Sequence, residues 1–210
     1  MKPKEFIAEN KKKFLNELFE LLKIQSVSAD TKFKNEVIKA ADYLVVQFNN
    51  LGLDNVKKIT TDGHPLVYAE KIINPDYTTI LVYGHYDVQP ADPYELWDSP
   101  PFEPIIKKNK IYSRGASDDK GQMYMHLKAY ETLKATTGID FNIKFLIEGE
   151  EECGSDNLEK FVIENQKIIL EELNVKKIKY VKSTDKLIQY EIKPNLPLIG
   201  QDYGKELPAI

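Results

Sequence analysis

A histidine and several carboxylates occur where a folded chain could bring them together. His85 and Asp87 follow the apolar run TTILVY, and Glu150, Glu151 and Glu152 follow the strand-like run FNIKFLIEG. In an open α/β sheet, ligands bind outside the carboxyl ends of the strands, so residues that follow two strands converge on one crevice. We therefore expect His85 and these glutamates to share a site.

A further acidic pair, Asp118 and Asp119, opens the helical segment before the second strand. Carboxylates that converge without nearby cations repel one another, so a bound divalent metal ion is the economical explanation. One imidazole among carboxylate oxygens, without a thiolate, suits zinc, with manganese or cobalt as alternatives. His85 would bind through one ring nitrogen, and Asp87 would accept a hydrogen bond from the other and fix the tautomer.

Each element also has an ordinary structural interpretation. A single histidine after a strand is more often packed or exposed than a ligand, and glutamates before a helix favour its positive N-terminus. The segment SDDKG alone is an unremarkable helix-capping turn. Their order along the chain and their shared placement at strand ends favour the metal site.

Hydrophobic periodicity predicts the elements that position these residues. Apolar residues at helical spacing predict helices over residues 4–23, 34–51, 118–135 and about 156–165. Strand-like runs, which we expect to share one sheet, cover residues 56–60, 65–71, 78–84 and 141–149. Strands that alternate with helices predict an α/β fold with a mostly parallel sheet flanked by helices.

Two other segments interrupt this pattern. Residues 89–110 contain five prolines and predict a long ordered loop around Trp97. From about residue 167 the pattern changes to strand, turn, strand and a proline-containing end. We therefore predict one domain over residues 1–166 and a small β-rich tail over residues 167–210.

Composition narrows the class of protein. Hydrophobic residues make up 42% and charged residues 30%, which is typical of a folded globular protein. No apolar run approaches the ~20 residues of a membrane span, and Cys153 is the single cysteine. The net charge of −4 argues against nucleic acid as a partner. We expect a cytoplasmic protein that does not bind membranes.

Four blocks together resemble a known enzyme family. GHYDVQPA, WDSPPFEP, IYSRGASDDKGQ and FLIEGEEECGSDNLEKF occur in family order and resemble the dinuclear zinc metallopeptidases related to carnosinase, cytosolic nonspecific dipeptidase, aminoacylase and acetylornithine deacetylase. The resemblance covers about residues 5–166, and the Trp97 block points to the dipeptidase branch. It implies a metal-dependent hydrolase that acts on small peptide substrates.

The resemblance also implies a role for each site residue. His85 would bind one of two zinc ions, Asp118 would bridge both, and Glu152 would bind the other. Glu151 would act as the general base and Asp87 as the partner of His85. The resemblance further implies a cis peptide bond between Asp118 and Asp119. Hydrolysis would proceed by two ions that activate a water, with Glu151 transferring its proton.

The sequence departs from the family at its later ligands. The family adds a further acidic ligand and a histidine near the end of a longer chain, after an inserted lid domain that carries the dimer interface. The other histidines here are His64 and His126, and we assign neither a metal role. We therefore expect a truncated catalytic domain, monomeric and without the lid, in an incomplete or inactive form.

The tail leaves further functions open. Residues of about 170–206 resemble a C-terminal segment of isoleucyl-tRNA synthetases, although an unrelated hairpin would explain the same pattern. Besides a dipeptidase-like hydrolase, the alternatives are a catalytically dead metal-binding fragment and an RNA-associated module that acts through the tail. The acidic first 173 residues make the RNA-associated module the weakest of the three.

Overall fold

The computed structural model describes residues 1–165, 175–184 and 187–194. The chain divides into two compact units, Met1–Glu164 and Asn165–Ile210. In the second unit, the described strands β7 (Val175–Thr184) and β8 (Leu187–Pro194) pair antiparallel. The division falls beside the boundary that the sequence predicts, while the origin of the tail stays a prediction.

The first unit is built on a four-stranded sheet with the order β1-β2-β6-β3. Its strands are β1 (Asp54–Ile59), β2 (Leu66–Lys71), β3 (Thr79–His85) and β6 (Asn142–Glu148). All four were expected from their β-branched and aromatic content, and their membership of one sheet is confirmed.

The prediction of a mostly parallel sheet is wrong. Only β3 and β6 pair parallel, whereas β1 pairs antiparallel with β2 and β2 pairs antiparallel with β6. The short connection between β1 and β2 allows antiparallel pairing, whereas a parallel pair needs a long crossover. The connection from β3 to β6 supplies one, because it contains a helix.

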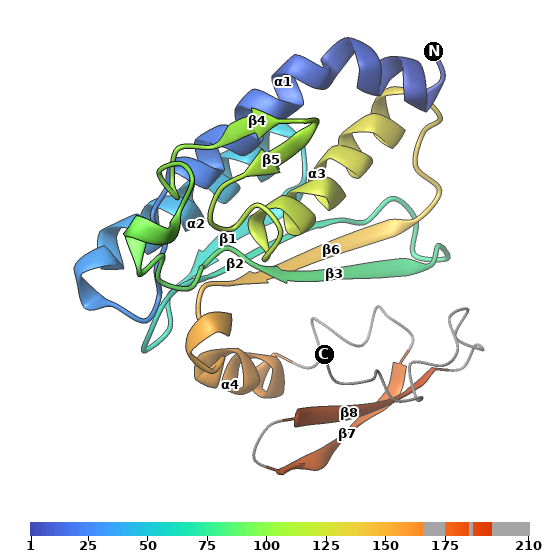
Figure 1. Ribbon diagram of the computed structural model, residues 1–210. Helices are drawn as coiled ribbons and strands as arrows, with labels where there is room; N and C mark the ends of the chain where they lie inside the picture. Colours follow the sequence, from blue (N-terminus) through green and yellow to red (C-terminus); the bar gives the residue numbers. More distant parts are fainter. Residues whose placement is uncertain (166–174, 185–186, 195–210) are drawn as a thin grey trace, which may run out of the picture. The chain divides into compact units, whose positions relative to one another are not determined.

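The helices confirm the α/β class. They are α1 (Pro3–Lys23), α2 (Lys34–Asn50), α3 (Lys120–Ala135) and α4 (Asp156–Glu164). Their bounds agree with the predicted ranges to within two residues. Figure 1 shows α1, α2 and α3 on one face of the sheet. Among the described residues, no helix has the length and apolar content that a membrane crossing requires.

The main hydrophobic core lies between these three helices and the sheet. Leu21 of α1, Leu44 and Phe48 of α2 and Leu127 of α3 are fully buried there, and Phe145 of β6 meets them. The rings of Phe48 and Phe145 lie 5.0 Å apart between centroids. Full burial of such side chains contributes about 1.5–3 kcal/mol each, so this core fixes the sheet that carries the candidate site.

The prediction of a long loop over residues 89–110 is only partly confirmed. Its end forms a small hairpin of β4 (Ile105–Lys107) and β5 (Lys110–Tyr112). The two connecting residues, Lys108 and Asn109, have φ values of 51° and 61°, as a tight two-residue hairpin turn requires. The signal for this hairpin was the pair of short runs IIK and KIY on either side of Lys108-Asn109.

Candidate metal centre

Parallel pairing of β3 and β6 brings their carboxyl ends to one edge of the sheet. His85, the last residue of β3, lies opposite Glu148, the last residue of β6. A one-turn 3-10 helix, Glu151–Cys153, then follows β6 and places Glu151 and Glu152 near His85. The residues that follow β3 and β6 therefore lie together at this edge of the sheet.

Three side chains form a group that can hold a metal ion. One ligand atom each from His85, Asp118 and Glu152 lie within 4.8 Å of one another. Nε2 of His85 lies 3.1 Å from Oδ1 of Asp118. Zinc takes nitrogen and oxygen ligands at about 2.0–2.2 Å, so donor atoms at this spacing fit one ion with little rearrangement.

The three side chains differ in exposure. The side chain of His85 is 7% exposed, while that of Asp118 is 76% exposed. Glu152 is intermediate between them. The imidazole is therefore fixed in the fold, and the carboxylates face solvent, where an ion and a substrate can reach them.

Asp87 lies beside the second ring nitrogen of His85. Its Oδ1 is 3.4 Å from Nδ1, and its main-chain oxygen is 3.1 Å from the same nitrogen. Its Oδ2 accepts hydrogen bonds from Ser28 Oγ at 2.6 Å and from the main-chain N–H of Glu152 at 3.1 Å. A proton on Nδ1 directed at Asp87 leaves Nε2 free to face Asp118.

The charges around His85 favour a cation. Burial lowers the pKa of His85, but the hydrogen bond with Asp87 and the nearby carboxylates of Asp87, Glu151 and Asp119 raise it to about 9 from its ordinary 6.5. The same field that favours an imidazolium in the metal-free chain favours a divalent ion beside Nε2.

Glu151 lies within reach of the same ring nitrogen. Its Oε2 is 3.7 Å from Nε2 of His85, and its side chain is partly exposed. Burial raises the pKa of Glu151, and the neighbouring charges of Glu152, Asp87 and Asp118 raise it further, against the opposing effect of His85. A carboxylate with a raised pKa is a better proton acceptor near neutral pH.

The Asp118-Asp119 peptide bond is cis, as the family resemblance implied. Oδ2 of Asp119 accepts a hydrogen bond from the main-chain N–H of His85 at 3.1 Å. The next residue, Lys120, is fully buried, and its ammonium donates to the main-chain oxygens of Leu21 and Ile24. The loop that carries Asp118 is thus held to β3 and to the end of α1.

The glycine of SDDKG allows a close approach in the same loop. A Cβ at Gly121 would lie 2.0 Å from the main-chain oxygen of Ala116. The main-chain N–H of Gly121 also donates to the oxygen of Gly115. Only a residue without a side chain fits here, so the loop before Asp118 depends on this glycine.

Two residues of the site were missed by sequence reasoning. Ser28 reaches Asp87 because Val27 forms an isolated parallel bridge with Val88. Gln89 donates from Nε2 to Oε2 of Glu152 at 2.7 Å. Ser28 lies in the irregular QSVSAD segment, where no periodicity indicates its neighbours, whereas Gln89 belongs to the block GHYDVQPA and could have been considered.

The remaining acidic and histidine candidates lie outside the metal-capable group. Glu150 accepts hydrogen bonds from the main-chain N–H of His64 and from the side-chain amide of Asn157. The ring of His64 lies 3.0 Å from the main-chain oxygen of Ser28. His126 is exposed on α3. Among the described residues, the metal-capable group contains neither histidine.

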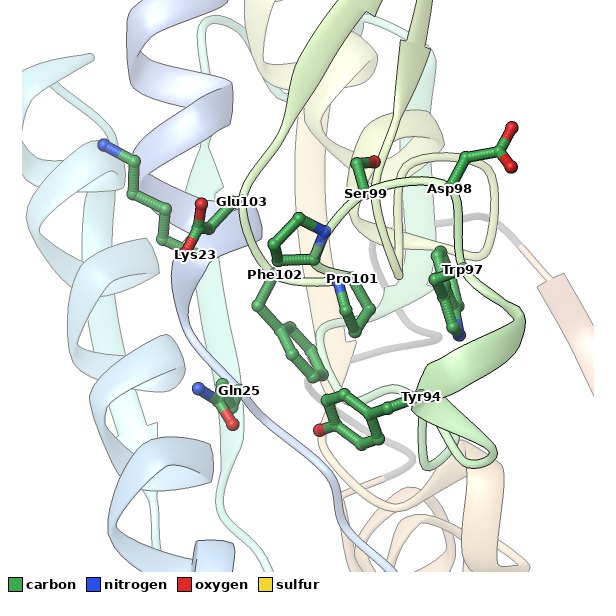
Figure 2. A pocket seen from close by; sticks show the side chains of 10 residues that line it. Lys23, Gln25, Tyr94, Trp97, Asp98, Ser99, Pro101, Phe102 and Glu103 are labelled. Atoms are coloured by element: carbon green, nitrogen blue, oxygen red, sulfur yellow. The ribbon is translucent and has the colours of Figure 1, made fainter.

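A separate pocket lies beside the Trp97 loop. Its volume is about 490 Å³, and the residues that line it include Lys23, Gln25, Tyr94, Trp97 and Phe102. Figure 2 shows these side chains. The indole N–H of Trp97 donates to the main-chain oxygen of Ala91, and the Arg114 guanidinium lies 5.2 Å from the indole centroid. None of the three metal-capable residues lines this pocket, so it is distinct from the metal centre.

Comparison with known proteins identifies the family. Residues 81–192 match the model of peptidase family M20/M25/M40. The chain is 35% identical over 170 residues to the Cys-Gly metallodipeptidase of Schizosaccharomyces pombe, covering 75% of this chain and 36% of that protein. It is 32% identical over 171 residues to human Beta-Ala-His dipeptidase, covering 75% and 34%.

Solved structures give the same result. The metallo-carboxypeptidase Sso-CP2 of Sulfolobus solfataricus superposes with a TM-score of 0.69 at 40% identity, over 74% of this chain and 35% of that one. Human carnosine dipeptidase 1 superposes with a TM-score of 0.75 at 27% identity, over 84% and 42%. The chain thus spans about a third of the length of its curated relatives.

The family match continues to residue 192, past the predicted boundary near residue 166. The resemblance of the tail to a synthetase segment stays a prediction. Taken with the catalytic-domain fold and the His-Asp-Glu group at the strand ends, these matches show that the chain belongs to the M20/M25/M40 peptidases, among relatives that are metallodipeptidases.

Proposed function

We propose that the chain carries part of the catalytic site of a zinc-dependent dipeptidase. His85, Asp118 and Glu152 would bind the metal, Glu151 would act as the general base, and Asp87 would hold His85. The observation that carries the proposal is the approach of His85, Asp118 and Glu152 to within 4.8 Å from three separate segments. The family and the dipeptidase relatives support the same reaction class.

Each protein group has a defined task in the proposed hydrolysis. Bound zinc would supply Lewis-acid polarisation of the scissile carbonyl and lower the pKa of the attacking water. Glu151 would accept a proton from that water and deliver it to the leaving amine. Asp87 would keep the Nδ1 proton of His85 in place, so that Nε2 stays available as a ligand.

Other parts of the proposal rest on the family resemblance. Two zinc ions are proposed, with manganese or cobalt as substitutes, and His85, Asp118 and Glu152 are the residues of this chain that would hold them. Among the described residues, the metal-capable group holds His85, Asp118 and Glu152, and we propose that these residues alone do not complete the ligand set that the resemblance implies. We also propose that it is monomeric and cytoplasmic.

The second candidate function is a metal-binding fragment without turnover. It is favoured by the same three ligands, since they suffice to bind an ion but do not complete the predicted ligand set. The RNA-associated module depends on the resemblance of the tail, about half of which lies outside the described residues, and no described contact favours it.

The deciding experiment measures hydrolysis and zinc binding together. The 210-residue chain is loaded with zinc and assayed on Cys-Gly and β-Ala-His, the dipeptides that the names of its relatives specify. If the chain is active, Glu151→Gln abolishes turnover and retains zinc, while the exposed control Glu95→Gln retains both. Zinc binding without turnover in the wild type would select the metal-binding fragment, and turnover by Glu151→Gln would contradict the proposed base.

A further inference from the structure

Gln89 lies against the carboxylate of Glu152. Its Nε2 donates to Oε2 at 2.7 Å and lies 3.3 Å from the main-chain oxygen of the same residue. Gln89 follows β3, whereas Glu152 follows β6, 63 residues later in the chain. The side-chain amide therefore links the two strand ends on which the metal centre is built.

The carboxylate of Glu152 needs such a contact. A glutamate has several rotatable bonds, and their restriction costs conformational entropy. Glu151 and Glu152 are also adjacent in the chain, and their like charges repel each other. In the metal-free chain, both effects favour rotation of Glu152 towards solvent. A hydrogen bond to one oxygen holds the carboxylate near His85 and leaves the other oxygen for an ion.

The main chain of Glu152 is already held from the same segment. Its N–H donates to Oδ2 of Asp87, two residues before Gln89. Asp87 thus fixes the backbone of Glu152, and Gln89 fixes its side chain. Two residues of one short segment therefore determine where the carboxylate points.

The chemistry of the donor matters as well as its position. An amide is a neutral donor, so it orients the carboxylate without cancelling the charge that attracts the ion. A lysine at the same place would form an ion pair with Glu152 and compete with the metal for it.

We propose that Gln89 is a positioning residue that orients Glu152 for metal binding. The inference rests on the proposed metal site, because it assigns Gln89 a role towards one of the proposed ligands. It requires no contact between Gln89 and the substrate or the reacting atoms.

The test is a calorimetric zinc titration of the full chain with three variants. Gln89→Met removes the amide at similar volume, Gln89→Lys replaces it with a cation, and Gln25→Met is the matched control in the pocket of Figure 2. We expect Gln89→Met to weaken zinc binding about tenfold, as loss of a partner of a metal ligand typically does. Gln89→Lys should weaken it further, and Gln25→Met should match the wild type.

Two additional readouts separate positioning from a general structural role. Because Gln89 is exposed, the thermal midpoint of metal-free Gln89→Met should equal that of the wild type. The visible absorption spectrum of the cobalt-loaded variant should shift, because the ligand geometry changes. Gln25→Met should keep both the thermal midpoint and the cobalt spectrum of the wild type.

The outcomes distinguish this inference from the proposed function. If the wild type binds zinc and the affinity of Gln89→Met lies within twofold of the wild-type affinity, the role of Gln89 is overturned and the metal site is not. An equal loss in Gln25→Met, or a lowered midpoint in metal-free Gln89→Met, would also overturn it. A wild type that binds no zinc would contradict the metal site itself, and the inference with it.

Discussion

Asp87 accepts a hydrogen bond from the main-chain N–H of Glu152, with 3.1 Å between Oδ2 and the nitrogen. This contact joins the end of β3 to the turn after β6. The carboxylate is fully buried, and its other oxygen faces the ring of His85. One side chain therefore contacts two proposed metal ligands that come from segments far apart in the chain.

Replacement of Asp87 by asparagine tests this connection. If the amide oxygen keeps the hydrogen bonds from Ser28 and Glu152, the amide NH2 group takes the place of the oxygen that lies 3.4 Å from Nδ1 of His85, and two donors then face each other. A buried donor without its partner costs about 1–3 kcal/mol. We expect the free energy of unfolding in urea to fall by about 2 kcal/mol and the zinc affinity to fall by about tenfold.

The control for Asp87→Asn is Asp140→Asn, an exposed aspartate before β6. Asp140→Asn should leave the free energy of unfolding and the zinc affinity unchanged. Equal stability and equal zinc affinity in Asp87→Asn and the wild type would show that Asp87 does not organise the site.

Gly121→Ala tests the close approach that shapes the loop before Asp118. The new Cβ would lie 2.0 Å from the oxygen of Ala116, a backbone atom. Either the helix or the loop must move, and such overpacking typically costs about 1–3 kcal/mol. We expect a loss of at least about 2 kcal/mol in the free energy of unfolding, together with weaker zinc binding.

Gly138→Ala serves as the comparison. Its Cβ has free space, but its φ of 82° is strained for alanine, so we expect a loss of about 1 kcal/mol and normal zinc binding. A Gly121→Ala chain as stable as Gly138→Ala, with wild-type zinc affinity, would contradict the packing described for this loop.

The carboxylate of Glu131 should make the free energy of unfolding depend on pH. Its carboxylate accepts hydrogen bonds from Lys13 of α1 and Lys128 of α3. Burial raises the pKa of Glu131, but these two lysines lower it more, so its pKa lies below the ordinary 4.5. Because the folded-state pKa is depressed, the stabilisation is present above about pH 4.5 and is lost as the pH falls through the folded-state value.

Urea unfolding of the wild type and Glu131→Gln from pH 7 to pH 3 measures this effect. The wild type should be more stable by about 1 kcal/mol at neutral pH, and the difference should shrink below pH 4.5. A difference that stays constant over this range would show that the ionised carboxylate does not contribute.

The sequence predicts the helices and strands well because their periods are regular. The wrong prediction of a mostly parallel sheet and the missed β4–β5 hairpin have physical causes. The pairing of β2 with β1 and β6 depends on connection lengths and tertiary packing, which hydrophobic periodicity does not encode. The β4–β5 hairpin was hidden by the preceding prolines, although its Lys108-Asn109 turn carried a local signal.

The residues of the candidate site also fall into those that the sequence predicts and those that it does not. Strand-end reasoning reaches His85 and the run of three glutamates that contains Glu152, whereas the choice of Asp118 and Glu152 as ligands came from the family resemblance. Ser28 comes from an irregular segment and meets Asp87 only through the Val27–Val88 bridge. No spacing rule predicts such a contact, because it depends on how the segment after α1 returns to the sheet.

The measurement that tests the central claim most directly is a calorimetric zinc titration of the wild type and His85→Ala, with His126→Ala as a matched control on the exposed face of α3. We predict stoichiometric binding by the wild type and His126→Ala, and its loss in His85→Ala. Unchanged binding by His85→Ala would contradict the metal centre proposed at the ends of β3 and β6.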